Sequence, residues 1–534
     1  MIDKEVVDLF GASDSLNVSQ IVEYLNMLSK YISPLLGKGP LTKKKPVESD
    51  NIFDHYPRSL DQVFSGLSVY FTDLVNWRSP RTHFNITPPV CNPAIAAAAL
   101  AHVMNQTLVS DMGSGNLSQL ELDIVKCFGE LAGWDSNSPS GVFTFGGTGT
   151  NIYGVKIGIN KADRHTSERG VHNVVTVDSD QCHSSHRTIA DWLGVGINNN
   201  IQIRADESGR LRATDIISTL DALIKQSKVI GCVTLSGGTT YDWSIDPIKE
   251  VKEGITELVA RHKLQYTPHI HTDAVIGWVY LFFKNYNFDA NPLRISERTL
   301  TKVRQARDRI IELRYADSFG IDFHKTGFCP ITSSLFMLRN KDDWKVLGKG
   351  TEHAHHQAFQ LGSYSPGKYT LETSRSTVGP VTTYVTLAAL GISGYQKIIA
   401  GLVEGAEDMR MRIESSEGFY NCNPYALGWC TMFLVRDNNS KITMEDLLTH
   451  APEHITKKSN QLQKEFQKYL RSLCSENGGW HISCSNDYKK SASGISISTL
   501  KLYPMSPLLQ IGDNRNLMDW LEQRREEFLG RKNA

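Results

Sequence analysis

The sequence predicts an α/β protein in which helices cover a largely parallel sheet. Short runs of β-branched or aromatic residues alternate with amphipathic helical stretches, and most of these runs are followed by polar or glycine-rich sequence. This order is typical of parallel strands with a helix between each pair. Six strands are expected, at residues 141–145, 173–178, 229–235, 269–273, 318–322 and 334–338.

The chain divides into three predicted regions. Residues 1–90 form a helical N-terminal segment, which an exposed loop around Lys43 to Lys45 interrupts. Residues 91–395 form the large domain, and this domain begins with a helix after Asn92 that we expect to pack on both sides. The residue pattern changes near residues 391–401, and we place the start of a small α+β domain there, residues 396–534. We assign this domain no chemistry of its own.

Charge and hydropathy exclude several kinds of partner. The 534 residues include 57 basic (Lys, Arg) and 57 acidic residues, so no net charge attracts nucleic acid or an anionic membrane. No uninterrupted apolar stretch approaches the roughly 20 residues of a membrane helix, and the N-terminus lacks a secretory pattern. We therefore expect a cytoplasmic protein whose partner is a small molecule or a second copy of itself. The nine scattered cysteines form no C-x-x-C pair and are interpreted as reduced core thiols.

A glycine-rich turn follows the first strand of the predicted large domain. In TFGGTGTNIYG, residues 144–154, the glycines let backbone N–H groups approach an anion, and the dipole of the following helix favours negative charge. The motif matches neither G-x-x-x-x-G-K-[ST] nor G-x-G-x-x-G. A phosphate cradle and a plain strand-to-helix turn are both consistent with it. The cradle residues are Gly147, Thr148, Gly149 and Thr150.

Two further polar residues follow predicted strands. His183 lies between a strand and a helix, where a histidine acts as an acid or base, as a flat surface for a ring, or as a capping neighbour. Asp273 ends an apolar strand, and a carboxylate there needs a cationic partner, either a protonated cofactor ring or an arginine. A metal site of His269, His271 and Asp273 is the less favoured alternative, because alternate strand residues supply only three ligands.

The last motif is ADSFGIDFHKTGFCP, in which Lys325 follows Asp322 and His324. An amine attacks an aldehyde only when it is deprotonated, and a partly desolvated site beside a cationic cofactor favours that form. A surface lysine is the default reading of this residue alone. The joint pattern of cradle, histidine, aspartate and lysine, each at a strand end, favours a cofactor site instead.

These four motifs together resemble the fold-type I pyridoxal-phosphate enzymes, and among them the group II amino-acid decarboxylases, over roughly residues 65–395. The resemblance implies a sheet of the seven-stranded type with a small C-terminal domain. It also implies that Lys325 of the His324–Lys325 pair carries pyridoxal 5'-phosphate as a Schiff base. Asp273 would pair with the pyridine nitrogen, His183 would stack on the ring, and GGTGTN would hold the phosphate.

Other positions resemble the family more loosely. Thr239 and Thr240 fall where the family has a threonine near the cofactor, and Asp322, also taken as a cofactor-binding candidate, stands where many members have asparagine. Arg375 matches an arginine after a mobile loop, which helps to hold that loop or its neighbour. His83, Phe84 and Asn85 resemble residues that line the substrate pocket.

One departure concerns the proton donor. Many family members carry a tyrosine on a mobile loop about 30 residues after the lysine, whereas this stretch reads GKGTEHAHHQAF. The candidates here are His353, His355, His356 and Tyr364. A different outcome, such as aldehyde formation, is therefore left open.

The resemblance implies decarboxylation of an L-amino acid to the amine and carbon dioxide, in a homodimer with the active site at the subunit interface. Two alternatives are a carbon–carbon lyase of the same fold, similar to sphingosine-phosphate lyase, and a catalytically silent regulatory homologue. The sequence does not identify the substrate, and it predicts no metal and no nucleic-acid or membrane partner.

Overall fold

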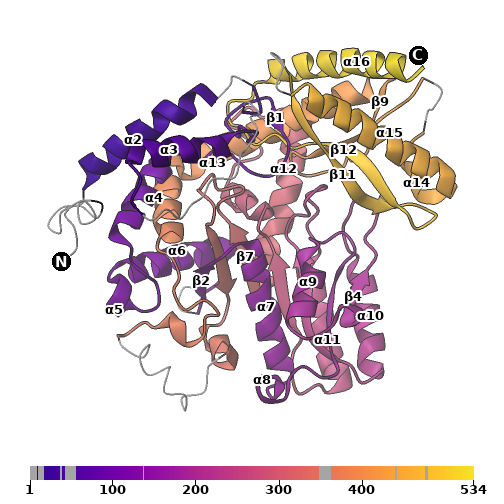
Figure 1. The fold of residues 1–534 in the computed structure, drawn as a ribbon. Coiled ribbons are helices and arrows are strands. Elements are labelled where there is room, and N and C mark those ends of the chain that lie inside the picture. Colours follow the sequence, from indigo (N-terminus) through magenta and orange to yellow (C-terminus); the bar gives the residue numbers. More distant parts are fainter. Residues whose placement is uncertain are drawn as a thin grey trace.

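The computed structural model describes residue 9 and residues 17–35, 39–42, 56–135, 138–347, 362–438, 442–474 and 479–533. In Figure 1 a large α/β domain occupies the lower part of the molecule, and the C-terminal elements lie above it. The predicted loop around Lys43 to Lys45 lies outside the described residues.

The large domain is built on a seven-stranded sheet, as the fold class predicted. Its strand order is β2-β8-β7-β6-β5-β3-β4, and only β8 runs antiparallel to its neighbours. The strands are β2 (Ser140–Thr144), β3 (Val174–Ser179), β4 (Asn200–Ile203), β5 (Val229–Ser236), β6 (His269–Asp273), β7 (Ser318–Asp322) and β8 (Ser334–Leu338). All six predicted strands are present. The seventh, β4, was not predicted, because four residues at the sheet edge carry little pattern.

Helices cover both faces of this sheet. The helices of the large domain are α6 (Leu117–Ala132), α7 (Gly147–Ala162), α8 (Thr166–Arg169), α9 (Ser185–Trp192), α10 (Ala213–Lys225), α11 (Ile248–His262) and α12 (Glu297–Ile310). Apolar side chains of α7 pack with β2, β3, β5 and β8 on one face. The residues of α6, α10, α11 and α12 join the main core on the other face. Gly158 lets α7 lie close to the sheet, because a Cβ there would be 2.5 Å from the carbonyl oxygen of Gly231.

The small domain has a second sheet, in the order β1-β11-β12-β10-β9. Its strands are β1 (Thr82–His83), β9 (Phe419–Asn421), β10 (Thr431–Val435), β11 (His481–Lys490) and β12 (Ser496–Leu502). The helices are α14 (Met444–Thr449), α15 (Glu453–Ser472) and α16 (Ile511–Asn533), and α15 and α16 pack with the sheet in a separate core. Because β1 pairs with β11, the chain just before the large domain is part of this sheet.

Helices α2 (Val18–Ile32), α3 (Leu60–Ser68), α4 (Asn92–Met104) and α5 (Asp111–Ser114) lie at the left of Figure 1. The remaining helix, α13 (Val378–Glu414), packs against α4 and also against α16 of the small domain. The expectation that the helix after Asn92 packs on both sides is wrong for the single chain, because only Ala94 and Ala101 of α4 are buried. Ala97, Ala98 and Val103 are half-buried, and Ile95, Leu100 and Met104 are exposed.

Helix α13 links the two domains and passes through the predicted boundary at residue 395. Gly391, with φ of 59°, breaks its helical path. Among the described helices it alone is long and apolar enough to cross a membrane by length and composition, which the sequence had not predicted. The segment before the break, residues 378–390, is about 20 Å long at 1.5 Å per residue, short of the ~30 Å bilayer core.

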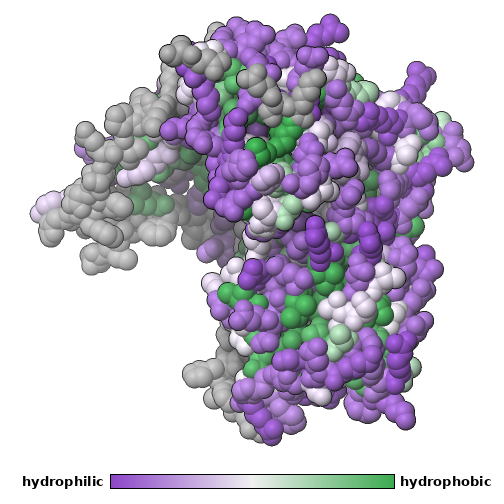
Figure 2. Space-filling model, turned by 90° about the vertical axis from the view of Figure 1, so that its right-hand side faces the viewer, coloured by the Kyte–Doolittle hydropathy of each residue, from purple (hydrophilic) through white to green (hydrophobic). Residues whose placement is uncertain are grey.

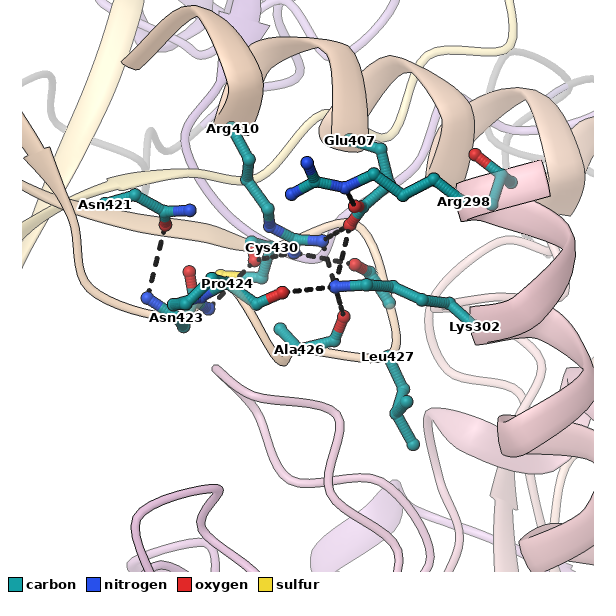
Figure 3. Close-up of polar contacts among 12 residues, drawn as sticks. Arg298, Lys302, Glu407, Arg410, Asn421, Asn423, Pro424, Ala426, Leu427 and Cys430 are labelled. Atoms are coloured by element: carbon teal, nitrogen blue, oxygen red, sulfur yellow. Dashed lines mark hydrogen bonds and ion pairs between the residues drawn. The ribbon is translucent and has the colours of Figure 1, made fainter. Parts of the chain in front are cut away.

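A buried cluster of charges joins α12 to α13 (Figure 3). The Glu407 carboxylate is 2.5 Å from Arg298 Nε and 3.0 Å from Lys302 Nζ, and it also accepts a hydrogen bond from Arg410. Arg410 in turn donates to the carbonyl oxygens of Gly428 and Cys430. These contacts fix the loop between β9 and β10 against the large domain.

Glu407→Gln should lower the free energy of unfolding by about 3–5 kcal/mol, because it leaves buried cations without their counter-ion. Glu414→Gln is the matched control, since Glu414 contacts the same Arg298 at 3.6 Å but is exposed, and it should cost at most about 1 kcal/mol. Burial opposes ionisation of Glu407, but the charges of Arg410 and Lys302 outweigh it and lower its pKa below 4.5. The stabilisation is therefore present above pH 4.5 and is lost as the pH falls through the lowered pKa. Urea unfolding at several pH values would contradict this origin if the wild-type advantage persisted in acid.

Candidate active site

His183, Asp273, His324 and Lys325, from three of the four motifs, meet in a cavity of about 260 Å³ at the carboxyl ends of the central strands. Ligands of open α/β sheets bind at such strand ends, because loops and helix N-termini gather there. The polar residues that line the cavity are Asn85, Thr87, His183, Ser236, Thr239, Thr240, Asp273, His324 and Lys325. They lie at the ends of β5 and β6 and in loops after β1, β3, β5 and β7, so residues far apart in the sequence share one site.

Lys325 lies three residues after the end of β7. Its Nζ is 2.8 Å from Oδ2 of Asp322, whose other oxygen accepts a hydrogen bond from Ser334. His324 is held by the backbone, since its Nδ1 is 3.1 Å from the carbonyl oxygen of Ser333. The lysine amine is therefore fixed at the cavity by a fully buried carboxylate.

Asp273 ends β6 and presents its two oxygens to different surroundings. Oδ2 accepts hydrogen bonds from Asn151 Nδ2 at 2.9 Å and His186 Nε2 at 3.3 Å. Oδ1 has only the Val275 N–H at 3.4 Å, so it remains available to a donor in the cavity. Burial opposes ionisation, but the hydrogen bond and charge of His186 and the charge of Lys325 outweigh it and hold the pKa of Asp273 well below its usual range. The carboxylate is thus ionised at neutral pH.

His183 precedes α9 and lines the cavity. Its Nδ1 is 2.8 Å from Ser185 Oγ and accepts the Ser185 N–H at 3.2 Å. Burial and the charge of Lys325 outweigh the opposing charge of Asp273 and lower its pKa, so the imidazole is neutral at neutral pH. A neutral ring with one edge fixed suits stacking against a flat ligand.

The glycine-rich turn begins α7 beside the lysine. A Cβ on Gly147 would be 2.7 Å from Oδ2 of Asp322, so only glycine allows this approach. The first N–H groups of a helix have no intrahelical acceptor and are free to bind an anion. Thr148 is exposed at this end, and Gly149 is buried against Thr144. Thr150 does not line the cradle, contrary to the prediction. It is fully buried, packs against Gly320 of β7 and donates its hydroxyl to the Gly147 carbonyl oxygen.

The residues of this site fit pyridoxal phosphate. Oδ1 of Asp273 can accept a hydrogen bond from a protonated ring nitrogen, the Lys325 amine can bind an aldehyde, and the start of α7 can hold a phosphate. In contrast, the described residues contain no group of three or more His, Cys, Asp or Glu placed to hold a metal. His269 and His271 instead bond to Ser318, and His271 also bonds to Asn151.

Of the three predicted pocket residues after residue 82, only Asn85 lines the cavity. His83 is buried with Nε2 3.1 Å from the Pro80 carbonyl oxygen, and burial lowers its pKa to about 4. Phe84 stacks on His481 of the small domain, with ring centroids 4.3 Å apart. Strand β1 directs these two side chains into the small domain, away from the cofactor site.

Tyr364 and Arg375 lie together around a carboxylate that the sequence did not single out. Arg375 forms a buried ion pair with Glu121 of α6, and the Tyr364 hydroxyl donates to the same carboxylate at 3.3 Å. Arg375 also donates to the carbonyl oxygen of Phe143 at 3.2 Å, next to the glycine-rich turn. Tyr364 is therefore engaged away from the cavity. The other predicted proton donors, His353, His355 and His356, lie outside the described residues.

One partner of Asp273, His186, was missed from the sequence, and it stands three residues after His183. The other, Asn151, is the last residue of GGTGTN, which was expected to hold the phosphate, but its side chain donates to Asp273 instead. The only signal was the second histidine in the segment HSSH, since the contact with Asp273 joins residues 87 positions apart.

The fold and the site define a fold-type I pyridoxal-phosphate protein. Residues 43–289 match the model of the pyridoxal-dependent decarboxylase conserved domain. This match covers slightly less than half of the chain, and it agrees with the resemblance that the motifs predicted.

Curated relatives are distant. The chain is 25% identical over 340 residues to L-2,4-diaminobutyrate decarboxylase of Rhizobium meliloti (strain 1021), a match that covers 64% of this chain and 62% of that protein. It is 21% identical over 370 residues to acidic amino acid decarboxylase GADL1 of Xenopus tropicalis, covering 68% of this chain and 62% of that protein. The match thus spans about three fifths of the length of these relatives.

Solved structures share the fold over nearly the whole chain. Mouse CSAD in its apo form superposes with a TM-score of 0.75 and 18% identity, covering 95% of this chain and 99% of that one. Oryza sativa TDC with PLP and tryptamine gives a TM-score of 0.75 at 15% identity, covering 97% of this chain and 100% of that one. At this identity the likeness concerns the fold alone.

Proposed function

We propose that this protein is a pyridoxal-phosphate-dependent decarboxylase that converts an L-amino acid to the amine and carbon dioxide. The observation that carries the proposal is the shared cavity of Lys325 and Asp273, an amine and an ionised carboxylate beside an anion-binding helix start. The names of the curated relatives, all amino-acid decarboxylases, support it.

Each residue has a defined task in this function. When bound, pyridoxal phosphate supplies an aldehyde for an amine and a ring that withdraws electrons from the bond to the departing carboxylate. Asp273 holds a positive charge at the ring nitrogen, and His183 orients the ring by contact with its face. Asp322 keeps the Lys325 amine beside the site. The protein thereby provides orientation and electrostatic stabilisation.

The surroundings of the cavity favour an acidic substrate side chain. A second pocket, which shares Asn85 with the cavity, is lined by Lys464, Arg471 and Lys501 and by no carboxylate. Lys501 is 8% exposed and has no ion pair within the described residues, although its Nζ lies 5.6 Å from the centre of the Tyr241 ring. Burial lowers the pKa of Lys501, so an anion nearby would stabilise its charged form.

Product analysis tests the proposed function. The purified protein, loaded with pyridoxal phosphate, would be offered the twenty amino acids, cysteine sulfinate and diaminobutyrate, and carbon dioxide, amine and aldehyde would be measured. Carbon dioxide with the matching amine, fastest for an acidic substrate, is the expected result. Aldehyde without carbon dioxide would show a carbon–carbon lyase, and aldehyde with carbon dioxide would show decarboxylation-coupled oxidation. A colourless protein that binds no cofactor would show a silent homologue.

The proposed enzyme is a homodimer whose interface adjoins the active site. Ile95, Leu100 and Met104 of α4 are 45–47% exposed, and α13, which packs against α4, exposes Tyr384 and Ile392. The start of α4 is bonded to the segment after Lys325, through the Cys91 N–H and the Phe328 carbonyl oxygen at 3.0 Å. This exposed apolar surface could face a second copy of the chain or a membrane. A second copy is favoured, because the break at Gly391 leaves α13 too short to span a membrane there.

Leu100→Glu should convert the dimer to a monomer, because it places a charge in an apolar interface. Sedimentation velocity at micromolar protein would show the change, and activity should fall with it. Ile197→Glu is the control: Ile197 is 43% exposed in η3 (Ile197–Asn199), beside β4, at the edge of the large sheet opposite β2. The face turned to the viewer in Figure 2 carries many polar residues, with an apolar patch in its lower half. A wild-type monomer with full activity would contradict the dimer.

A cytoplasmic location is also proposed. All nine cysteines are free, and five of them are buried, as in proteins of reducing compartments. Cys127 is exposed, so the cysteines are not all core residues as predicted. Fractionation of cells that express the tagged full-length protein tests this location.

A further inference from the structure

A second histidine lies directly behind the active site. His186 is in the first turn of α9, three residues after His183, and is 3% exposed. Its Nε2 is 3.3 Å from Oδ2 of Asp273. The proposed function uses His183 and Asp273 but assigns nothing to this residue.

The direction of the hydrogen bond follows from the acceptor. An ionised carboxylate has only acceptor atoms, so Nε2 of His186 must carry the proton and donate it to Asp273. Nδ1 of His186 has no hydrogen-bond partner within the described residues. Among the described residues, the imidazole of His186 therefore has one hydrogen bond, from Nε2 to the Asp273 carboxylate.

Two donors on one oxygen fix the rotation of the Asp273 carboxylate. Asn151 Nδ2 donates to the same Oδ2 at 2.9 Å, and Oδ1 of Asn151 lies 2.9 Å from His271 Nε2. The contact with His271 fixes which end of the Asn151 amide is the donor. With Oδ2 held from two sides, Oδ1 is directed to the cavity, where its only hydrogen bond is the long one to Val275.

A second buried carboxylate acts on the pKa of His186. Asp178 of β3 is 2% exposed and accepts a hydrogen bond from Asn200 at 2.7 Å. Burial alone would lower the pKa of His186, but the hydrogen bond to Asp273 and the charges of Asp273 and Asp178 outweigh it and raise the pKa. Burial raises the pKa of Asp178 in turn, which the charge of His186 and the hydrogen bond from Asn200 oppose.

We propose that His186 is a positioning residue, which fixes Asp273 by a hydrogen bond from Nε2 to Oδ2 so that Oδ1 faces the ring nitrogen of the cofactor. It acts through Asp273 and does not touch the substrate. This inference rests on the proposed cofactor site and adds to it a residue that sets how well that site holds the ring.

Two amide variants distinguish the effect of losing the hydrogen bond to Asp273 from the effects of changed side-chain size and polarity. In His186→Gln the side-chain amide nitrogen can occupy the place of Nε2, whereas in His186→Asn it reaches only the place of Nδ1. His186→Leu removes the donor entirely. His262→Gln is the control, because His262 forms a similar pair with Asp221 at 2.7 Å, between α10 and α11 on the outside of the domain.

The measurements are the dissociation constant of pyridoxal phosphate by fluorescence quenching, the pH titration of its visible absorption band, and kcat and KM. We expect His186→Asn and His186→Leu to bind the cofactor about 10- to 100-fold more weakly, the effect of losing one hydrogen bond to a buried charge. Their absorption band should titrate at a shifted pH, and at saturating cofactor kcat should fall with little change in KM. His186→Gln should stay within about threefold of wild type, like His262→Gln.

Equal cofactor affinity in the wild type and His186→Asn would overturn the inference, as would equal losses in His186→Gln and His186→Asn. The comparison of these two variants is sufficient even if His186→Leu does not fold. Borohydride trapping of the cofactor on Lys325 in the wild type is done first. If trapping succeeds and the variants bind normally, the role of His186 fails while the cofactor site stands; if trapping fails, the proposed function itself fails.

Discussion

Lys325→Ala is expected to abolish turnover and to leave no residue to which borohydride can fix the cofactor. The Lys325 amine is the only lysine nitrogen that lines the cavity within the described residues, and Asp322 holds it there at 2.8 Å. Loss of a covalent nucleophile removes a reaction route and not merely a contact, so we expect at least a thousandfold fall in kcat, about 4 kcal/mol of barrier.

Lys249→Ala is the matched control for this change. Lys249 lies on α11 with a partly exposed side chain, 3.8 Å from Glu253, and its removal should leave turnover and trapping intact. Wild-type and variant proteins would be reduced with borohydride in the presence of pyridoxal phosphate, digested and analysed by mass spectrometry. An adduct on another lysine, or an active Lys325→Ala protein, would disprove the assignment.

The strands and the residues at their ends could be predicted because their signal is local. β3 and β5 are short, largely apolar runs between glycine-rich or polar segments, and parallel strands buried on both faces require that composition. Once such strands are placed in parallel, their carboxyl ends meet at one edge. Asp273, His183 and Lys325 follow strand ends, so their convergence was predictable without knowing any distance.

The partners of these residues could not be predicted, because each contact joins distant parts of the chain. Asn151 and Asp273 are 122 positions apart, and Arg375 and Glu121 are 254 apart. Side-chain direction was equally hidden. Thr150 lies in the glycine-rich motif but faces the sheet, since the helix turns its side chain from the cradle toward Gly320. The sequence shows where polar groups gather, whereas packing decides which of them face the ligand.

Asp273→Asn is expected to lower kcat at least a hundredfold, although it changes the shape of the side chain very little. In the wild type, Asn151 and His186 both donate to Oδ2. An asparagine must therefore place its oxygen at the Oδ2 position, which forces its NH₂ group to the position of Oδ1. A donor then faces the ring nitrogen where an acceptor stood, and this selects the unprotonated ring, which withdraws electrons poorly.

The visible spectrum distinguishes this reversal from a general loss of structure. Asp273→Asn should still form the borohydride adduct on Lys325, but its absorption band should no longer show the wild-type dependence on pH. Asp317→Asn is the control. Asp317 is also a carboxylate, but it precedes the first residue of β7, at the end of the sheet away from the cavity, and pairs with Lys252 at 2.8 Å. It should lower the melting temperature without altering the spectrum. A fully active Asp273→Asn protein would disprove this role of residue 273. No other carboxylate lines the described cavity and could take its place.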